Sequence, residues 1–117
     1  MVARDLAALQ ALLDRLPRSP IANVRLECKH FFSGAAAYAN GRIFMTWTDV
    51  GLALKLPEDA RTILIAEGAV PLRYFPQGPI KHSYVVVPER LAADEAALAK
   101  WIGESVRFSQ TQPKPRS

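Results

Sequence analysis

The sequence predicts a single α+β domain, a mostly antiparallel sheet of five strands with helices on one face, in the order α-β-β-β-α-β-β-α. Two observations predict this fold. Three segments repeat apolar residues at helical spacing, and two other regions combine strand-like alternation with hairpin turn residues. The chain has 117 residues, half of them hydrophobic, so it can bury one core. We expect residues 1–108 to form this domain.

Leucines at helical spacing predict a first helix over residues 3–16, and Pro17 stops the pattern. The leucines on the shared face are Leu6, Leu9, Leu13 and Leu16. Residues 22–30 then form a connection that can hold some extended structure. No strand is assigned to this connection.

A three-stranded meander follows. Asn40-Gly41 is the strongest hairpin signal, because both central positions of a type I′ turn favour positive φ. It joins strands over residues 35–39 and 42–48, and Asp49-Val50-Gly51 leads into a third strand over 52–56. The residues expected to face the core are Ile43, Met45, Trp47, Leu52, Leu54 and Leu56.

A helix, a second hairpin and a last helix complete the predicted fold. Pro57 can open a helix over residues 57–67 at its first position. The β-rich runs over 70–75 and 82–87 form the hairpin, in which Pro71 indicates an edge or strand-entry position. An apolar stripe after Pro88 predicts the final helix, from about residue 89 to residue 108.

The charge balance gives little support to nucleic-acid binding. The net charge is +4, but Lys114 and Arg116 lie in a proline-rich polar stretch, residues 109–117, that we expect to be a disordered tail. The remaining residues carry 13 basic and 11 acidic groups, a net charge of only +2. The sequence has no export signal or membrane-spanning run, so we expect a cytoplasmic protein with no membrane contact.

Candidate catalytic residues are few. Cys28 and His30 stand two apart, and His82 could approach from the second hairpin, giving a nucleophile–base pair or a three-ligand metal site. The competing interpretation, which we favour, is a structural cysteine and ordinary surface histidines. No phosphate-binding, hydrolase or zinc-protease motif occurs. We therefore expect no enzyme activity, no cofactor and no metal.

Strand alternation predicts a binding surface on the side of the sheet that faces away from the helices. If the core residues point inward, Phe44 and Lys55 point outward. Arg73 and Tyr84 on the second hairpin are candidates for the same surface, although the sequence leaves their side open. An aromatic and basic sheet surface can bind a protein through such anchors or stack nucleic-acid bases.

A second candidate is the loop before the first strand, where Phe31, Ser33 and Gly34 could touch a ligand because glycine admits close backbone approach. The structural alternative, which we favour, is that Phe32 packs in the core and Gly34 relieves backbone strain at a turn or bulge that leads into the first strand. On that interpretation, Gly34→Val harms stability first.

Over residues 5–108 the sequence resembles the N-terminal domain of the TfoX/Sxy competence-regulator family, because several short motifs occur in the same order. These motifs are Phe31-Phe32-Ser33-Gly34, Gly41, Ile43-Phe44, Lys55, Tyr84 through Pro88, and Leu91 through Glu95. The resemblance implies the predicted order of elements and a link to the control of DNA uptake. We expect a protein-interaction module with an unknown protein partner or a second copy of the chain. Weak nucleic-acid binding and an enzyme using Cys28 and His30 are the alternatives.

Overall fold

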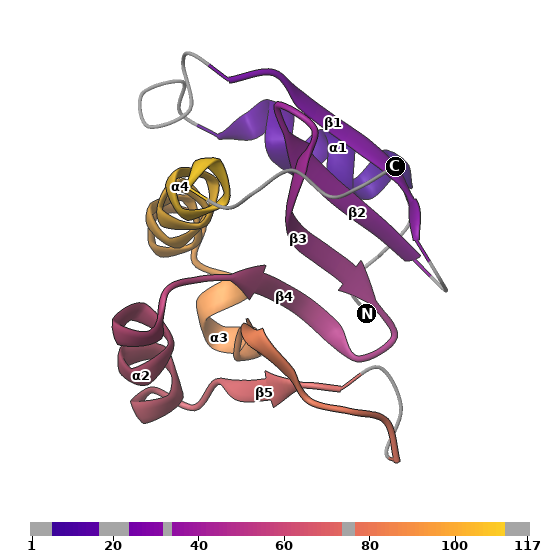
Figure 1. Cartoon of the computed structure of the whole chain (residues 1–117). Helices are drawn as coiled ribbons and strands as arrows, with labels where there is room; N and C mark the ends of the chain where they lie inside the picture. Colours follow the sequence, from indigo (N-terminus) through magenta and orange to yellow (C-terminus); the bar gives the residue numbers. More distant parts are fainter. Residues whose placement is uncertain (1–5, 17–23, 32–33, 74–76, 112–117) are drawn as a thin grey trace.

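A computed structural model describes residues 6–16, 24–31, 34–73 and 77–111, and it shows one antiparallel sheet with helices beside it (Figure 1). The strands run in the order β1-β2-β3-β4-β6-β5. The strands are β1 (Leu26–Phe31), β2 (Gly34–Ala39), β3 (Arg42–Thr48), β4 (Gly51–Lys55), β5 (Val70–Leu72) and β6 (Lys81–Val86), and the helices are α1 (Leu6–Arg15), α2 (Glu58–Ala66), α3 (Glu89–Ala92) and α4 (Glu95–Gln110). The predicted α+β class is confirmed.

The expected count of five strands is wrong, because the sheet has six. The additional strand is β1, which occupies much of the segment expected to be a connection and pairs with β2 along its whole length. The sequence of this strand, LECKHF, did not predict it, because charged and aromatic side chains interrupt the apolar pattern. An edge strand can carry such side chains, since it pairs on one side only and remains partly exposed.

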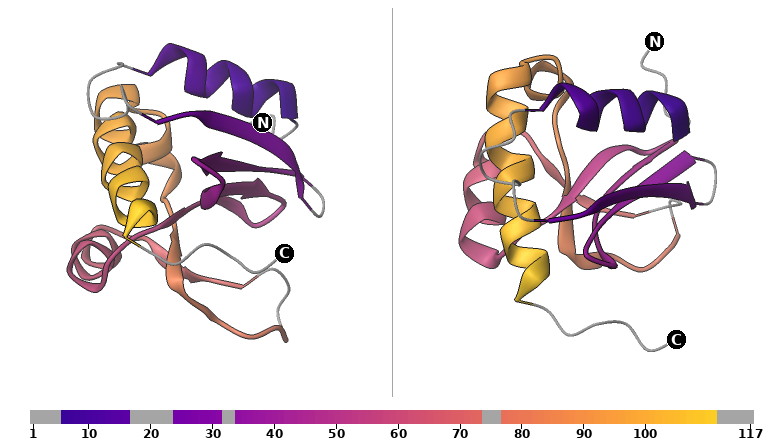
Figure 2. Two further views of the ribbon diagram at one scale, coloured as in Figure 1. Left: turned by 45° about the horizontal axis from the view of Figure 1, so that its top comes forward. Right: turned by 90° about the horizontal axis from the view of Figure 1, so that it is seen from above.

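All the helices contribute to one core on a single face of the sheet. Helix α1 covers β1 and β2, α4 covers β3 and β4, and α2 lies against β6. Figure 2 shows α1 and α4 on the same side of the sheet, running in different directions. The largest fully buried side chains from these elements are Leu9, Phe44, Met45, Leu54, Leu64, Val85, Leu98 and Ile102. Pro71 lies in the edge strand β5, as expected.

The predicted C-terminal helix is two helices. Asp94 interrupts it with an extended backbone, and its carboxylate accepts a hydrogen bond from the Ala97 amide at 3.2 Å, which caps the start of α4. Helix α4 continues to Gln110, two residues beyond the predicted end, and Ser109 is fully buried. Ser109 and Gln110, expected to belong to the tail over 109–117, are therefore helical, and residues 112–117 lie outside the described residues.

A β-bulge reverses the predicted orientation of two residues in β3. Ala37 pairs with Met45 but the next residue, Tyr38, pairs with Ile43, so β3 carries Phe44 as an extra residue. Phe44 is fully buried in the core beside Met45, whereas Ile43 shares the opposite face with Tyr38 and is partly exposed. The expectation that Phe44 points outward and Ile43 inward is wrong, because both followed from unbroken alternation.

Ser105 fastens α4 to two strands where they separate. The ladder between β3 and β4 ends at the pair Met45 and Leu54, whereas on its other side β4 stays paired with β6 as far as Lys55, opposite Tyr84. The Ser105 hydroxyl is fully buried and lies 2.7 Å from the carbonyl oxygens of both Phe44 and Lys55. Its single proton can serve either acceptor. One side chain of the helix thus occupies the fork between two strands.

The other end of α4 is tied to the turn between β2 and β3. Asn40 and Gly41 both have positive φ, as the turn prediction required. The Gln110 side chain donates to the Ala39 carbonyl oxygen at 2.9 Å and accepts from the Asn40 amide at 3.1 Å. Asn40 in turn accepts from the Arg25 backbone at 3.0 Å. Helix α4 and the strands β1 to β3 are therefore joined at this turn.

Gly34 is required by close backbone packing. A Cβ atom at this position would lie 1.9 Å from the carbonyl oxygen of Trp47 on the neighbouring strand. This supports the structural interpretation of Gly34. Gly41 differs, because a Cβ atom there would meet nothing within 4 Å and only its φ of +81° disfavours other residues.

We expect Gly34→Ala to lower the free energy of unfolding by about 3 kcal/mol, because β2 and β3 must move apart to admit the methyl group. Gly41→Ala is the matched control and should cost about 1 kcal/mol, through its backbone conformation alone. Urea unfolding followed by circular dichroism measures both. A Gly34→Ala protein no less stable than Gly41→Ala would show that the two strands do not approach as closely as described.

Candidate functional site

The residues considered for catalysis do not converge. Cys28 and His30 lie on β1 at one edge of the sheet, and His82 lies on β6, with β2, β3 and β4 between them. The three side chains therefore cannot share a metal ion. Within the described ranges there is no group of three or more His, Cys, Asp or Glu side chains that could hold one.

Cys28 has the electrostatics of a structural thiol. Its side chain is partly buried against the core, on the same face as Ala37. Burial, and to a lesser extent the nearby carboxylate of Asp14, raises the pKa of the Cys28 thiol to about 11. A nucleophilic cysteine needs the opposite shift, because the thiolate is the reactive form.

The sheet surface that faces away from the helices carries two lysine–tyrosine pairs, one on each half of the sheet. In each pair the two side chains are neighbours. Lys55 of β4 pairs directly with Tyr84 of β6, so their side chains are adjacent on one face. On the other half of the sheet, the Lys29 ammonium lies 5.0 Å from the ring centroid of Tyr38. We call this surface the outer face and define it by Lys29, Phe31, Tyr38, Ile43, Lys55 and Tyr84, each of which is at least partly exposed.

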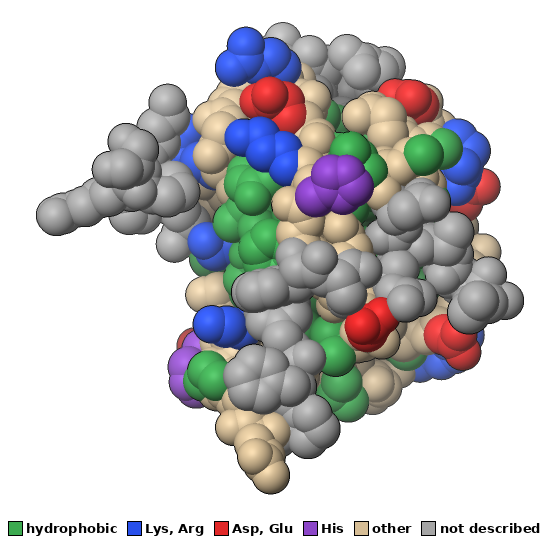
Figure 3. All heavy atoms as spheres, turned by 90° about the vertical axis from the view of Figure 1, so that its right-hand side faces the viewer, with side chains coloured by type: hydrophobic (Ala, Val, Ile, Leu, Met, Phe, Trp, Pro, Cys, Tyr) green, Lys and Arg blue, Asp and Glu red, His purple; other side chains and the backbone are tan. Residues whose placement is uncertain are grey.

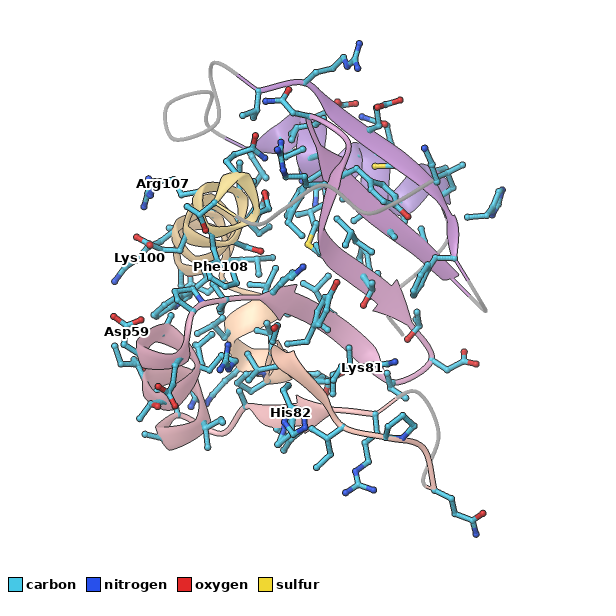
Figure 4. All side chains as sticks on the ribbon, viewed as in Figure 1. Asp59, Lys81, His82, Lys100, Arg107 and Phe108 are labelled. Atoms are coloured by element: carbon cyan, nitrogen blue, oxygen red, sulfur yellow. The ribbon has the colours of Figure 1, made fainter. Side chains whose placement is uncertain are left out.

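The outer face can be followed in the figures. In Figure 1, α1 lies behind β1 and β2, so the outer face of these strands looks toward the viewer. Figure 3 shows the molecule from the right-hand side of Figure 1, and in this view Lys, Arg and His side chains border a strip of hydrophobic side chains. By contrast, Lys100 and Arg107 project from α4 away from the sheet (Figure 4).

The structure brings only some of the predicted binding residues together. Lys55 and Tyr84 are adjacent, but Phe44 belongs to the core and not to the outer face. Arg73 follows β5, is exposed, and donates to the Gly78 carbonyl oxygen at 3.4 Å within the loop before β6. It therefore lies beyond the end of the edge strand β5, and not on a strand that carries a lysine–tyrosine pair.

Of the residues predicted to form a ligand-binding loop, the structure describes Phe31 and Gly34. Phe31 ends β1 and is partly exposed on the outer face, opposite Gly34 at the start of β2. Ser33 and Phe32 lie outside the described residues. Sequence reasoning missed Lys29 and Tyr38, although the alternation of Tyr38 with Ala35, Ala37 and Ala39 was a usable signal.

A line of small residues crosses the middle of the outer face. The register aligns Ala36, Thr46 and Ala53 on adjacent strands, and all three are fully buried. The Thr46 hydroxyl has no hydrogen-bond partner within the described part of the chain. An unpaired buried hydroxyl costs about 1–3 kcal/mol, so this position is costly for stability.

The core face holds a cavity that the sequence did not indicate. It has a volume of about 440 Å³ and lies between α1, the α3–α4 junction and the turn that joins β3 to β4. Its walls come from three separate segments of the chain, which explains why no local pattern predicts it. Its lining includes Arg15, Trp47, Leu52, Glu89, Ala93, Glu95 and Leu98.

A pH profile of alkylation tests the state of Cys28. With a pKa of about 11, about one thiol in a thousand is ionised at pH 8. We expect the rate with iodoacetamide to rise about tenfold per pH unit from pH 8 to pH 10 without levelling off, whereas the guanidinium-unfolded chain levels off near the ordinary cysteine pKa of about 8.5. A plateau below pH 8.5 in the folded protein would contradict a buried structural thiol.

Comparisons with known proteins assign the chain to a family. The family model of the TfoX N-terminal domain matches residues 22–109, most of the described fold from β1 to α4. Comparison with the curated proteins and with the solved structures returned no match. None of the described helices has the length and apolar character needed to cross a membrane. On the family match, the chain belongs to the TfoX N-terminal domain family.

Proposed function

We propose that this TfoX N-terminal domain is a cytoplasmic protein-binding module without catalytic activity, and that it contacts its partner through the outer face. The observation that carries the proposal is the placement of two lysine–tyrosine pairs, Lys29 with Tyr38 and Lys55 with Tyr84, on the sheet surface that no described helix covers. The family's association with control of DNA uptake makes transcriptional regulators the first partners to test.

The chemistry of these side chains suits a protein contact. Tyrosine is enriched at the hot spots of protein interfaces. Its ring buries a large area with few rotatable bonds, and its hydroxyl can still form a hydrogen bond. A lysine beside each ring adds a cation whose aliphatic stem can pack on the aromatic surface. Together the pairs favour a partner that presents apolar groups flanked by carboxylates.

The placement of Cys28, His30 and His82 also favours binding over catalysis. Cys28 and His30 lie on β1, separated by three strands from His82 on β6, and burial disfavours the thiolate of Cys28. A nucleophile needs a base within hydrogen-bond reach and a group that orients this base. Neither the metal-site geometry nor the thiol activation considered from the sequence is present among the described residues.

An affinity capture with charge-reversed variants tests the proposal. We expect Lys55→Glu and Lys29→Glu each to reduce recovery of the partner from native lysate about tenfold, because a carboxylate on the outer face repels an acidic partner. Lys100→Glu is the matched control, since Lys100 is exposed on α4 away from the sheet (Figure 4). Quantitative mass spectrometry of the captured proteins gives the measurement.

The result that would overturn the proposal is an unchanged set of captured proteins in both outer-face variants, with circular dichroism showing that they are folded. Direct nucleic-acid binding through the same lysines is the competing function. It requires a gel shift that weakens steeply between low and moderate salt, because phosphate contacts release counterions. The absence of a shift at low salt would eliminate it.

A further inference from the structure

We propose that the cavity on the core face is a second binding site, separate from the outer face, and that it takes a small amphipathic cation, an apolar body with an ammonium or guanidinium head. The cavity lies between α1, the α3–α4 junction and the β3–β4 turn. The outer face is on the other side of the sheet, so this site does not depend on the proposed protein contact.

The apolar body fits the walls of the cavity. Leu52 and Leu98 are almost fully buried and line the interior, and the partly buried indole of Trp47 forms part of the wall. The volume of about 440 Å³ lies within the range of about 300–1,000 Å³ that is typical of small-molecule pockets. Apolar walls with polar groups at the mouth are also the usual composition of such sites.

The charged groups that line the cavity favour a cationic head. Arg15 of α1 and Glu95 of α4 form an ion pair at 3.1 Å between Nε and Oε1, and both side chains are more than half exposed. This pair neutralises the guanidinium. Glu89 of α3 adds a second carboxylate that is exposed, so the lining carries a net charge of −1.

The start of α4 does not provide an anion site in competition with this assignment. Helix N-termini bind anions through backbone amides that lack intrahelical partners. Here the Asp94 carboxylate already accepts from the Ala97 amide at 3.2 Å. The capping carboxylate also places a further negative charge next to Glu95. An anionic head would therefore meet carboxylates where it needs donors.

Calorimetric titration with a matched pair of probes tests the charge preference. The probes are decyltrimethylammonium and decyl sulfate, which share an apolar chain and differ in the sign of the head, each used below its micelle-forming concentration. We expect the cation to bind at least tenfold more tightly than the anion. Glu89→Gln should reduce this preference about fivefold, because one of the two lining carboxylates is lost. Glu67→Gln, at the exposed end of α2, is the control and should leave the preference unchanged.

A blocking variant tests the location. Ala93 lines the cavity and is exposed, so Ala93→Phe can fill its opening without changing the core. We expect it to abolish binding of decyltrimethylammonium. Ala96→Phe, at an exposed position of α4 outside the lining, introduces the same ring and should bind as the unmodified protein does.

Four results would overturn the assignment. Three of them are equal binding of the two probes, tighter binding of the anion, and full binding by Ala93→Phe. The fourth is failure of the unmodified protein to bind decyltrimethylammonium. Loss of a captured protein in Ala93→Phe, without probe binding by the unmodified protein, would instead assign the cavity to a protein partner. Circular dichroism of each variant keeps a folding defect distinct from a lost site.

Discussion

The fold depends on the contact that Ser105 of α4 makes with two strand carbonyls. A buried hydroxyl and two carbonyl oxygens are costly unless they satisfy one another, and here each carbonyl is 2.7 Å from the same hydroxyl. The contact holds α4 where β3 and β4 separate, while β4 remains paired with β6 on its other side. The junction therefore fixes where α4 packs on the core face, and strand alternation divides the sheet residues between this face and the outer face.

The two candidate sites are consequences of that division. On the core face, the helices cover the strands but leave a cavity where α1, the α3–α4 junction and the β3–β4 turn meet. On the opposite face no described helix packs, and the register aligns small buried residues between larger, partly exposed aromatic and lysine side chains. The shape and charge of both surfaces suit the recognition of a ligand or a protein. Among the described residues, neither surface places a nucleophile beside a base.

The sequence predicted those parts of the fold that local chemistry controls. The Asn40-Gly41 turn and the alternation around Leu54 depend on neighbouring residues, and the structure confirms the hairpin that they predicted. The polar edge strand β1 was missed because its sequence lacks the apolar alternation of a strand. Its pairing with β2 holds it in the sheet, and no local pattern reveals that pairing. Phe44 was misplaced because a bulge depends on the match between two strands and leaves no signal in either one.

The candidate sites were predicted less completely than the fold. Lys55 and Tyr84 were both named from the sequence, yet only the register of β4 and β6 shows that they are neighbours. The cavity could not be predicted, since Arg15 and Glu95 are 80 residues apart and meet only after the helices have packed. Function at such a site belongs to the assembled fold and not to any one segment.

Amide hydrogen exchange in Ser105→Ala tests most directly whether this junction holds the helix and the strands as one unit. The account predicts that protection falls by a similar factor, about tenfold, at Met45, Leu54 and Ile102, because one lost hydrogen bond of about 1.4 kcal/mol weakens both strands and the helix together. A loss of protection confined to α4, with β3 and β4 unchanged, would contradict it.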